Sequence, residues 1–268
     1  MRRLRVLVLM HKDLVPPDQL NGQDLEGAAW KTEYDVVSTL RKLGHDVQPL
    51  GVKSDLEVIR AAVEDWKPHI AFNLLEEFDG RAVYDQNVVS YLELMRIPYT
   101  GCNPRGLMLA RDKALAKQVM SYHRIPYPEF MVVPLHRMVR RPKYLPFPLI
   151  VKSISEEASL GISQASIVDD DEKLRERVAF IYTSVGTGAL IERYIEGREL
   201  YVGVMGNAHL QVFPVWELVM DKMPDEARRI ATERVKWSRK YQDKYGICSC
   251  EARNLPDGVV DHIQHLAK

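Results

Sequence analysis

Residues 147–164, "FPLIVKSISEEASLGISQ", join a β-like run to a loop of small residues. Residues 148–151 are apolar and lead directly into Lys152, and a second β-like run begins at Gly161. A strand that ends on an ammonium group beside serine, alanine and glycine offers a point charge and close backbone approach. That combination suits a polyphosphate, with the loop acting as a mobile lid.

The same residues also fit an ordinary hairpin connection that carries a snorkelling lysine. Glu156 and Glu157 lie in the loop and count against a simple anion cradle. Taken alone, Lys152 therefore favours the hairpin. Other parts of the chain have to decide between the two interpretations.

The composition is that of an ordinary globular protein. The chain has 268 residues, of which 46% are hydrophobic, and its 37 basic residues balance 37 acidic ones. No overall charge therefore favours nucleic acid or an anionic membrane as a partner. Three cysteines are too few for a disulfide framework and lack the paired spacing of a zinc site. The cysteine content therefore favours a reduced cytoplasm. The apolar run at residues 4–10 is too short for a signal peptide or a membrane span and predicts a strand.

The first hundred residues alternate between β-like and helical patterns. The run at residues 4–10 is nearly all apolar, as in a parallel sheet buried on both faces, and residues 45–50 and 69–75 predict further strands. Between these strands, one helix is expected to end at Gly44 and a second to be capped by Ser54. Such βαβα repetition predicts a parallel sheet flanked by helices.

A sheet of this kind often binds a dinucleotide, but the usual fingerprints are missing. The loop after the first strand has no Gly-x-Gly-x-x-Gly, and Gly-x-x-x-x-Gly-Lys-Ser/Thr occurs nowhere in the chain. If the chain binds a nucleotide, a different structural motif must hold the phosphates.

The pattern changes in the second part of the chain. Asn103 and Asp112 can each cap a helix, and the second of these helices is expected to turn Leu115, Val119 and Tyr122 inward. A small α+β unit and then a mainly antiparallel unit are predicted to follow. Strands are expected at residues 130–133, 149–153, 161–168, 189–194, 199–205 and 209–215, with a turn at residues 196–197 between the fourth and the fifth.

Lys113 follows the capping residue Asp112 and so lies in the first turn of its helix. A cation in that position opposes the helix dipole, at a cost of a few tenths to about 1 kcal/mol. A tolerated surface lysine and a functional lysine fit the position equally well.

Three stretches taken together are more informative than any lysine alone. They read "YTGCNPRGLMLARDKALAK", "FPLIVKSISEEASLGIS" and "ALIERYIEGRELYVGVMGN". In this order and spacing they resemble the D-alanine–D-alanine ligase branch of the ATP-grasp superfamily, and the likeness extends over essentially the whole chain. It implies an α/β fold with an N-terminal parallel-sheet preATP-grasp domain at residues 1–102. A central ATP-grasp subdomain with the phosphate loop would follow at 103–190, and the start of an incomplete C-terminal subdomain at 191–268.

The resemblance implies a role for each matched residue. Lys113, Lys152 and Lys244 match lysines that contact ATP phosphates, and Ser159 and Gly161 match a loop whose N–H groups face the phosphate oxygens. Of the matched residues, Lys152, Lys244, Tyr245 and Glu26 would take part in catalysis. The remaining matches are Glu192 near the adenine amino group, the backbone of Arg193, Tyr194 and Ile195 along the adenine edge, Glu199 on the ribose hydroxyls, Tyr245 ordering the loop, and Glu26 as the nearest candidate to contact a substrate amino group.

The chain departs from the family pattern within the loop. Ala158 replaces the serine that would hydrogen-bond Tyr245, and Glu157 stands where the family has glycine. A lost buried hydrogen bond typically weakens such a network by about 1–3 kcal/mol. We therefore expect a poor D-alanine–D-alanine ligase that prefers another substrate pair, such as a larger amino acid or a peptide. In the alternative interpretation, Glu157 points to solvent and Ser159 supplies the missing hydroxyl.

For a complete protein, the resemblance implies an ATP-dependent carboxylate–amine ligase that works through an acyl phosphate with ATP and magnesium as cofactors. The family's magnesium ligands would lie beyond residue 268, so we expect the fragment itself to be inactive. A nucleotide-binding pseudoenzyme or regulatory protein is the alternative, and residues 225–244 could instead form an exposed partner-binding helix. The expected partners are amino acids or peptides, without nucleic acid or membrane, and a homodimer is left open.

Overall fold

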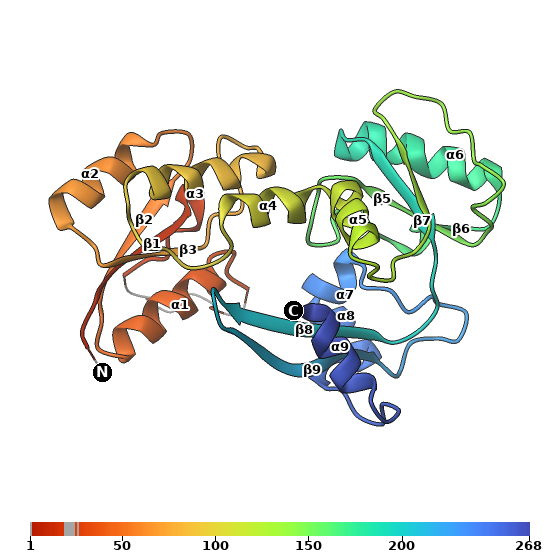
Figure 1. The fold of residues 1–268 in the computed structure, drawn as a ribbon. Helices are drawn as coiled ribbons and strands as arrows, with labels where there is room; N and C mark the ends of the chain where they lie inside the picture. Colours follow the sequence, from red (N-terminus) through yellow and green to blue (C-terminus); the bar gives the residue numbers. More distant parts are fainter. Residues whose placement is uncertain (1, 19–24, 26) are drawn as a thin grey trace. The chain divides into compact units, whose positions relative to one another are not determined.

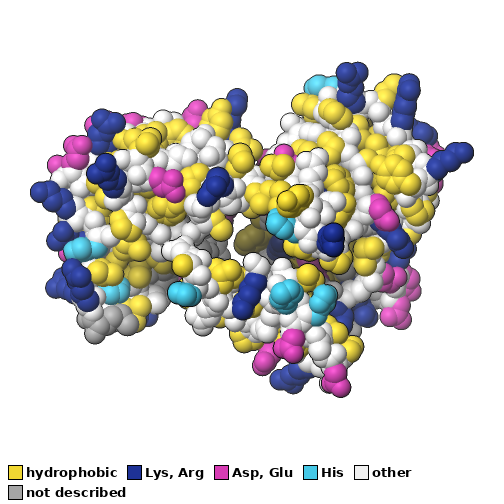
Figure 2. All heavy atoms as spheres, in the orientation of Figure 1, with side chains coloured by type: hydrophobic (Ala, Val, Ile, Leu, Met, Phe, Trp, Pro, Cys, Tyr) yellow, Lys and Arg dark blue, Asp and Glu magenta, His cyan; other side chains and the backbone are white. Residues whose placement is uncertain are grey.

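A computed structural model describes residues 2–18, 25 and 27–268 (Figure 1). The chain divides into two compact units, Met1–Arg111 and Asp112–Lys268. The division of the sequence into three parts stays a prediction. On the face shown in Figure 2, basic and acidic side chains are interspersed, in keeping with the formal net charge of zero.

The first unit is built on a three-stranded parallel sheet in the order β2-β1-β3. Strand β1 (Arg5–His11) lies in the middle and pairs with β2 (Asp46–Val52) and β3 (Ile70–Asn73). A parallel bridge between Ala71 and Tyr99 extends the sheet. The predicted parallel sheet is therefore confirmed.

Strand β1 is buried on both faces, which explains its continuous apolar sequence. Leu7 and Leu9 pack with the apolar residues of α2 (Glu57–Trp66) and α3 (Asp85–Leu94) on one face. Val6, Val8 and Met10 pack against Val37 of α1 (Lys31–Lys42) on the other face. Helix α4 (Pro104–Arg111) completes the unit, and two short 3₁₀ turns lie at Lys12–Leu14 and Ala82–Tyr84.

The helix caps follow the predictions with one exception. Asn103 accepts a hydrogen bond from the N–H of Gly106, as an N-cap residue should. The predicted cap of α2 by Ser54 was wrong. Asp55 instead accepts the N–H of Glu57, at 2.8 Å. Gly44, just after α1, has a φ of +85°, which is the left-handed conformation expected of a glycine that ends a helix.

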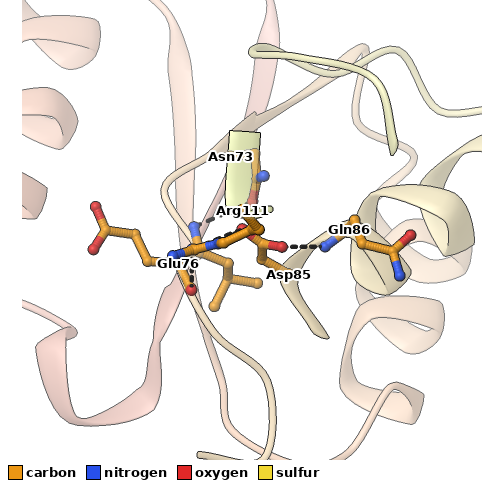
Figure 3. A network of polar contacts seen from close by, with 6 residues as sticks. Asn73, Glu76, Asp85, Gln86 and Arg111 are labelled. Carbon is orange, nitrogen blue, oxygen red and sulfur yellow. Dashed lines mark hydrogen bonds and ion pairs between the residues drawn. The ribbon is translucent and has the colours of Figure 1, made fainter. Parts of the chain in front are cut away.

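A buried ion pair fixes the loop that follows β3 (Figure 3). Arg111 Nη2 lies 2.8 Å from Asp85 Oδ2 and donates to the main-chain oxygen of Glu76 at 2.7 Å. The Asn73 side chain accepts the N–H of Leu75 in the same loop. A buried charge needs such a partner, so this contact ties α4 and α3 to the end of β3.

The second unit begins with a four-stranded antiparallel sheet in the order β4-β7-β5-β6. Its strands are β4 (Phe130–Val133), β5 (Leu149–Ser153), β6 (Ile167–Val168) and β7 (Ala189–Arg193). Helices α5 (Lys113–Tyr122) and α6 (Asp171–Phe180) accompany this sheet, and a π-helical turn (Ile181–Val185) follows α6. The core of this part consists of Val133, Leu145, Leu149, Val151, Val168, Leu174, Val178, Ile181, Ala189 and Ile191.

Two predictions in this part of the chain were wrong. The predicted strand at residues 161–168 is reduced to two residues, because a capping box between Ser163 and Ser166 forms a 3₁₀ turn before it. Tyr122 and Val119 do not face inward: they are 84% and 37% exposed, and Ala114 is the buried residue of α5.

A second antiparallel sheet in the order β10-β9-β8 follows. It consists of β8 (Glu199–Gly206), β9 (Leu210–Met220) and β10 (Ile247–Glu251), and α9 (Val259–Ala267) packs on β8 and β9. Because β7 and β8 belong to different sheets, the turn at residues 196–197 links two sheets and does not close a hairpin.

The segment at residues 225–244 is not one exposed helix. It contains two short helices, α7 (Glu233–Trp237) and α8 (Arg239–Tyr245). Ile230 and Val235 are buried, so this segment packs on its own unit.

The β8–β9 hairpin depends on Gly206, which has a φ of +128°. A Cβ atom there would lie 2.0 Å from the main-chain oxygen of His209. We expect Gly206→Ala to lower the thermal midpoint by about 5 °C or more, because a loss of about 2 kcal/mol shifts a domain of this size by roughly 4–8 °C. Calorimetry checks this.

The matched control is Gly186→Ala, where φ is +78° but no atom lies within 4 Å of the added Cβ. Only the conformational cost of roughly 1–2 kcal/mol applies there. At Gly206 the clash adds to that cost, so Gly186→Ala should shift the thermal midpoint less than Gly206→Ala. Equal shifts for the two variants would contradict the proposed steric clash.

Candidate functional site

A buried carboxylate lies at the centre of the candidate site. Glu192 on β7 is 5% exposed. Its Oε2 lies 2.8 Å from Lys117 Nζ, and its Oε1 forms an ion pair with Lys152 Nζ. Two ammonium groups thus share one carboxylate, and the group as a whole carries excess positive charge that an anion can neutralise.

The strand register explains why Lys152 reaches Glu192. On the antiparallel strands β5 and β7, Lys152 lies opposite Leu190 and Glu192 lies opposite Ile150. Lys152 and Glu192 are therefore diagonal neighbours on the same face of the sheet.

Lys117 reaches the same carboxylate from α5. Helical spacing places Lys117 one turn after Lys113, on the same side of that helix. Sequence reasoning missed Lys117, although the i, i+4 spacing of two lysines in "DKALAK" was a readable signal.

Lys113 contacts the loop that follows β5. Its Nζ donates to the main-chain oxygen of Glu156 at 2.5 Å, and its backbone N–H donates to Ile154. Asp112 accepts the N–H groups of Ala114 and Leu115 and caps α5, as predicted. Lys113 therefore lies against the loop that follows β5, and Lys152 lies on β5 itself.

Residues 155–161, called here the phosphate loop, adopt an unusual backbone conformation. Ala158, Ser159 and Gly161 have φ angles of +54°, +65° and +71°. The Ser159 hydroxyl donates to the main-chain oxygen of Ala231 at 2.5 Å, so it is already bonded. Among the described residues, no acceptor is found for the N–H groups of Ser159 and Gly161. That these two groups bind phosphate oxygens, as the resemblance implies, stays a prediction.

The backbone of residues 193–195, the predicted adenine edge, is partly hydrogen-bonded within the chain, and its role stays a prediction. The N–H groups of Arg193 and Tyr194 donate to the main-chain oxygens of Glu129 and Pro148. Within the described part of the chain, Ile195 is the one of the three residues whose N–H has no acceptor. Its side chain is 59% exposed.

Glu199 lies near the start of β8, where it accepts a hydrogen bond from the Tyr201 hydroxyl. Burial, together with the neighbouring Glu199 carboxylate, raises the pKa of Tyr201 well above its usual range. Tyr201 therefore stays a neutral donor. Glu199 and Tyr194 line a cavity of about 710 Å³, and Leu218, Met220 and Cys250 are also part of its wall.

The same cavity carries an ion pair on its wall. The Arg198 guanidinium makes two hydrogen bonds with the Glu217 carboxylate, at 2.7 and 2.5 Å. This contact lowers the pKa of Glu217. Arg198 also donates to the main-chain oxygens of Arg253 and Asn254, and so braces the chain after β10.

Lys244 and Tyr245 lie on α8 beside the second sheet. Tyr245 packs against the cluster of Met220, Val235 and Ile247, and its ring lies 4.8 Å from Lys244 Nζ. Trp237, which precedes α8, contacts the phosphate loop: its indole N–H donates to the main-chain oxygen of Ala158 at 3.1 Å. The roles implied for Lys244 and Tyr245 stay predictions.

Two further predictions concern the substrate and the metal. Glu26, the candidate to contact a substrate amino group, lies outside the described residues. The described part of the chain contains no group of three histidine, cysteine, aspartate or glutamate residues that could hold a metal ion. No described helix is long and apolar enough to cross a membrane.

The family model of the D-Ala–D-Ala ligase C-terminus matches residues 119–268, which is more than half of the chain. The chain belongs to the D-alanine–D-alanine ligase family. It is 33% identical over 177 residues to the D-alanine–D-alanine ligase of Granulibacter bethesdensis, which covers 66% of this chain and 55% of the relative. It is 30% identical over 190 residues to that of Desulforudis audaxviator, which covers 69% and 58%.

Solved structures of the D-alanine–D-alanine ligase family share the fold. The crystal structure of the Bacillus anthracis D-alanine–D-alanine ligase aligns with a TM-score of 0.69 at 19% identity and covers 98% of this chain and 76% of that one. The predicted fold class is confirmed. The matches span little more than half the length of the curated relatives, namely 55% and 58% of the two family members above.

We expect Lys117→Met to destabilise the second unit, because Glu192 would remain buried with only one cationic partner. A charge-assisted hydrogen bond of this kind contributes about 1.5–3 kcal/mol. Urea unfolding followed by circular dichroism measures the change. The control is Lys173→Met, since Lys173 and Asp170 form an exposed pair that should contribute less than about 1 kcal/mol. Equal losses in the two variants would contradict the assigned importance of Lys117.

Proposed function

We propose that this chain binds ATP at the lysine cluster and serves an ATP-dependent ligase that joins a carboxylate to an amine with release of ADP and phosphate. The observation that carries the proposal is the convergence of Lys113, Lys117 and Lys152 beside a loop with unbonded N–H groups. The ligase activity named for the family members supports the type of reaction.

The chemistry follows from what an unreactive carboxylate needs. A substrate carboxylate oxygen attacks the γ-phosphorus, the bond to the β–γ bridging oxygen breaks, and ADP leaves. The acyl phosphate then accepts the amine of a second substrate, which loses a proton while phosphate departs. In this chain, Lys113 and Lys152 would offset the charge of the phosphates, and the phosphate loop would exclude water that otherwise hydrolyses the acyl phosphate.

Amino acids or peptides are the proposed substrates, and the loop sequence bears on the choice between them. Glu157 is exposed in a loop that lies beside the proposed phosphate position, and its charge would disfavour a small substrate carboxylate nearby. Nucleotide binding without any substrate-dependent ADP formation would instead favour a nucleotide-binding protein that is not a ligase.

We expect Lys152→Ala to weaken ADP binding about tenfold or more, because one charge-assisted contact to phosphate contributes about 1.5–3 kcal/mol. Isothermal titration calorimetry of the 268-residue chain measures the affinity. Lys173→Ala, which removes a lysine from the exposed pair with Asp170, is the matched control and should bind ADP like the parent. The proposal fails if the parent chain does not bind ADP, or if Lys152→Ala binds it equally well.

A further inference from the structure

A row of hydrogen bonds joins the phosphate loop and the residues just after it to the segment that contains α7. The Ser159 hydroxyl donates to Ala231, and the Trp237 indole donates to Ala158. Farther along, the Gln164 side chain both donates to the main-chain oxygen of Arg228 and accepts its N–H, each at 2.9 Å. We call these contacts the seam. They connect parts of the chain that are more than sixty residues apart.

Trp237 stands out among the seam residues because burial does not explain its position. Its side chain is 69% exposed, whereas a core tryptophan would be covered. It lines a cavity of about 570 Å³ beside Gln164 and also one of about 520 Å³ beside Tyr201 and Lys236. The indole therefore lies between these two cavities, with its N–H directed to the loop.

Helix α7 holds Trp237 in place although it has only five residues. The Thr232 hydroxyl caps it by accepting the N–H of Val235. Thr232 and Val235 are 6% and 1% exposed, so the helix is anchored from beneath. The last residue of the helix, Trp237, is the one whose side chain donates to Ala158 of the loop.

The loop needs an external support of this kind. Ala158 and Ser159 are both left-handed, which costs an L-residue about 1–2 kcal/mol each, so the conformation persists only where other contacts hold it. The seam binds these same two residues, through the main-chain oxygen of Ala158 and the hydroxyl of Ser159. Within the loop, the N–H groups of Leu160 and Ile162 donate to Glu157 and Ser159 and complete the turn.

We propose that Trp237 is a positioning residue that latches the phosphate loop in the conformation that leaves the N–H groups of Ser159 and Gly161 free for phosphate. The latch uses a main-chain acceptor and therefore does not need a side-chain hydroxyl at position 158. This inference rests on the proposed function for its ligand, but the latch itself exists without nucleotide.

Hydrogen exchange without nucleotide tests the latch, with the Leu160 and Ile162 amides as reporters. We expect Trp237→Phe, which keeps a ring but removes the donor, to accelerate their exchange about fivefold, as the loss of one hydrogen bond implies. Trp237→His keeps a ring N–H and should restore part of the protection. Trp216→Phe is the control, because Trp216 is a half-exposed residue of β9 outside the seam, and it should leave both rates unchanged.

An unchanged rate in Trp237→Phe, or the same acceleration in Trp216→Phe, would overturn the latch. Calorimetric titration with ADP then tests whether the latch positions the phosphate loop for nucleotide binding. Trp237→Phe should bind ADP about threefold to tenfold more weakly while its thermal midpoint stays that of the parent. Equal affinity would overturn the positioning role. If the parent chain itself does not bind ADP, the proposed function fails, whereas the exchange result still decides whether the latch exists.

Discussion

The arrangement of the second unit depends on the burial of one carboxylate. Glu192 is removed from water in the middle of a sheet, and an ionised carboxylate in such a place is strongly unfavourable without partners. Lys117 and Lys152 supply those partners from a helix and from the neighbouring strand. Satisfying this one group brings α5, β5 and β7 together, and it leaves the lysines where an incoming anion would meet them.

The phosphate loop follows from the same arrangement. It begins two residues after the end of β5, the strand that carries Lys152, and Lys113 holds its first part through the main-chain oxygen of Glu156. At its other end, the loop is bound to the segment before α7 through Ser159. The loop is thus held by two supports from different parts of the second unit, the first turn of α5 and the segment before α7. The left-handed residues Ala158 and Ser159 can persist there because residues outside the loop hold it in place.

Local patterns predicted the elements that local physics controls. The continuous apolar run of β1 predicted a strand buried on both faces, and Asn103 and Asp112 cap their helices as their side chains suggest. Strand β5 has the predicted bounds because its apolar residues and the following serine mark both ends. The resemblance also predicted the fold of the whole chain, since several separate motifs had to coincide in order and spacing.

Contacts between distant residues could not be predicted in the same way. Nothing local to Lys117 indicates that Glu192 is its partner, because the contact exists only once β7 lies beside β5. Trp237 contacts Ala158 across seventy-nine positions, and no local pattern around either residue indicates this contact. The periodic pattern placed Tyr122 inward, but α5 ends at that residue and leaves it exposed. Tertiary packing overrode the pattern there.

An acyl-phosphate derivative of ATP tests the central claim most directly, because it transfers its acyl group to whichever lysine lies beside the phosphates. After digestion, mass spectrometry identifies the labelled residue. The account predicts that Lys113, Lys117 or Lys152 carries the label and that excess ADP prevents the labelling. Labelling confined to exposed lysines such as Lys173, or labelling of the cluster that ADP does not suppress, would contradict it.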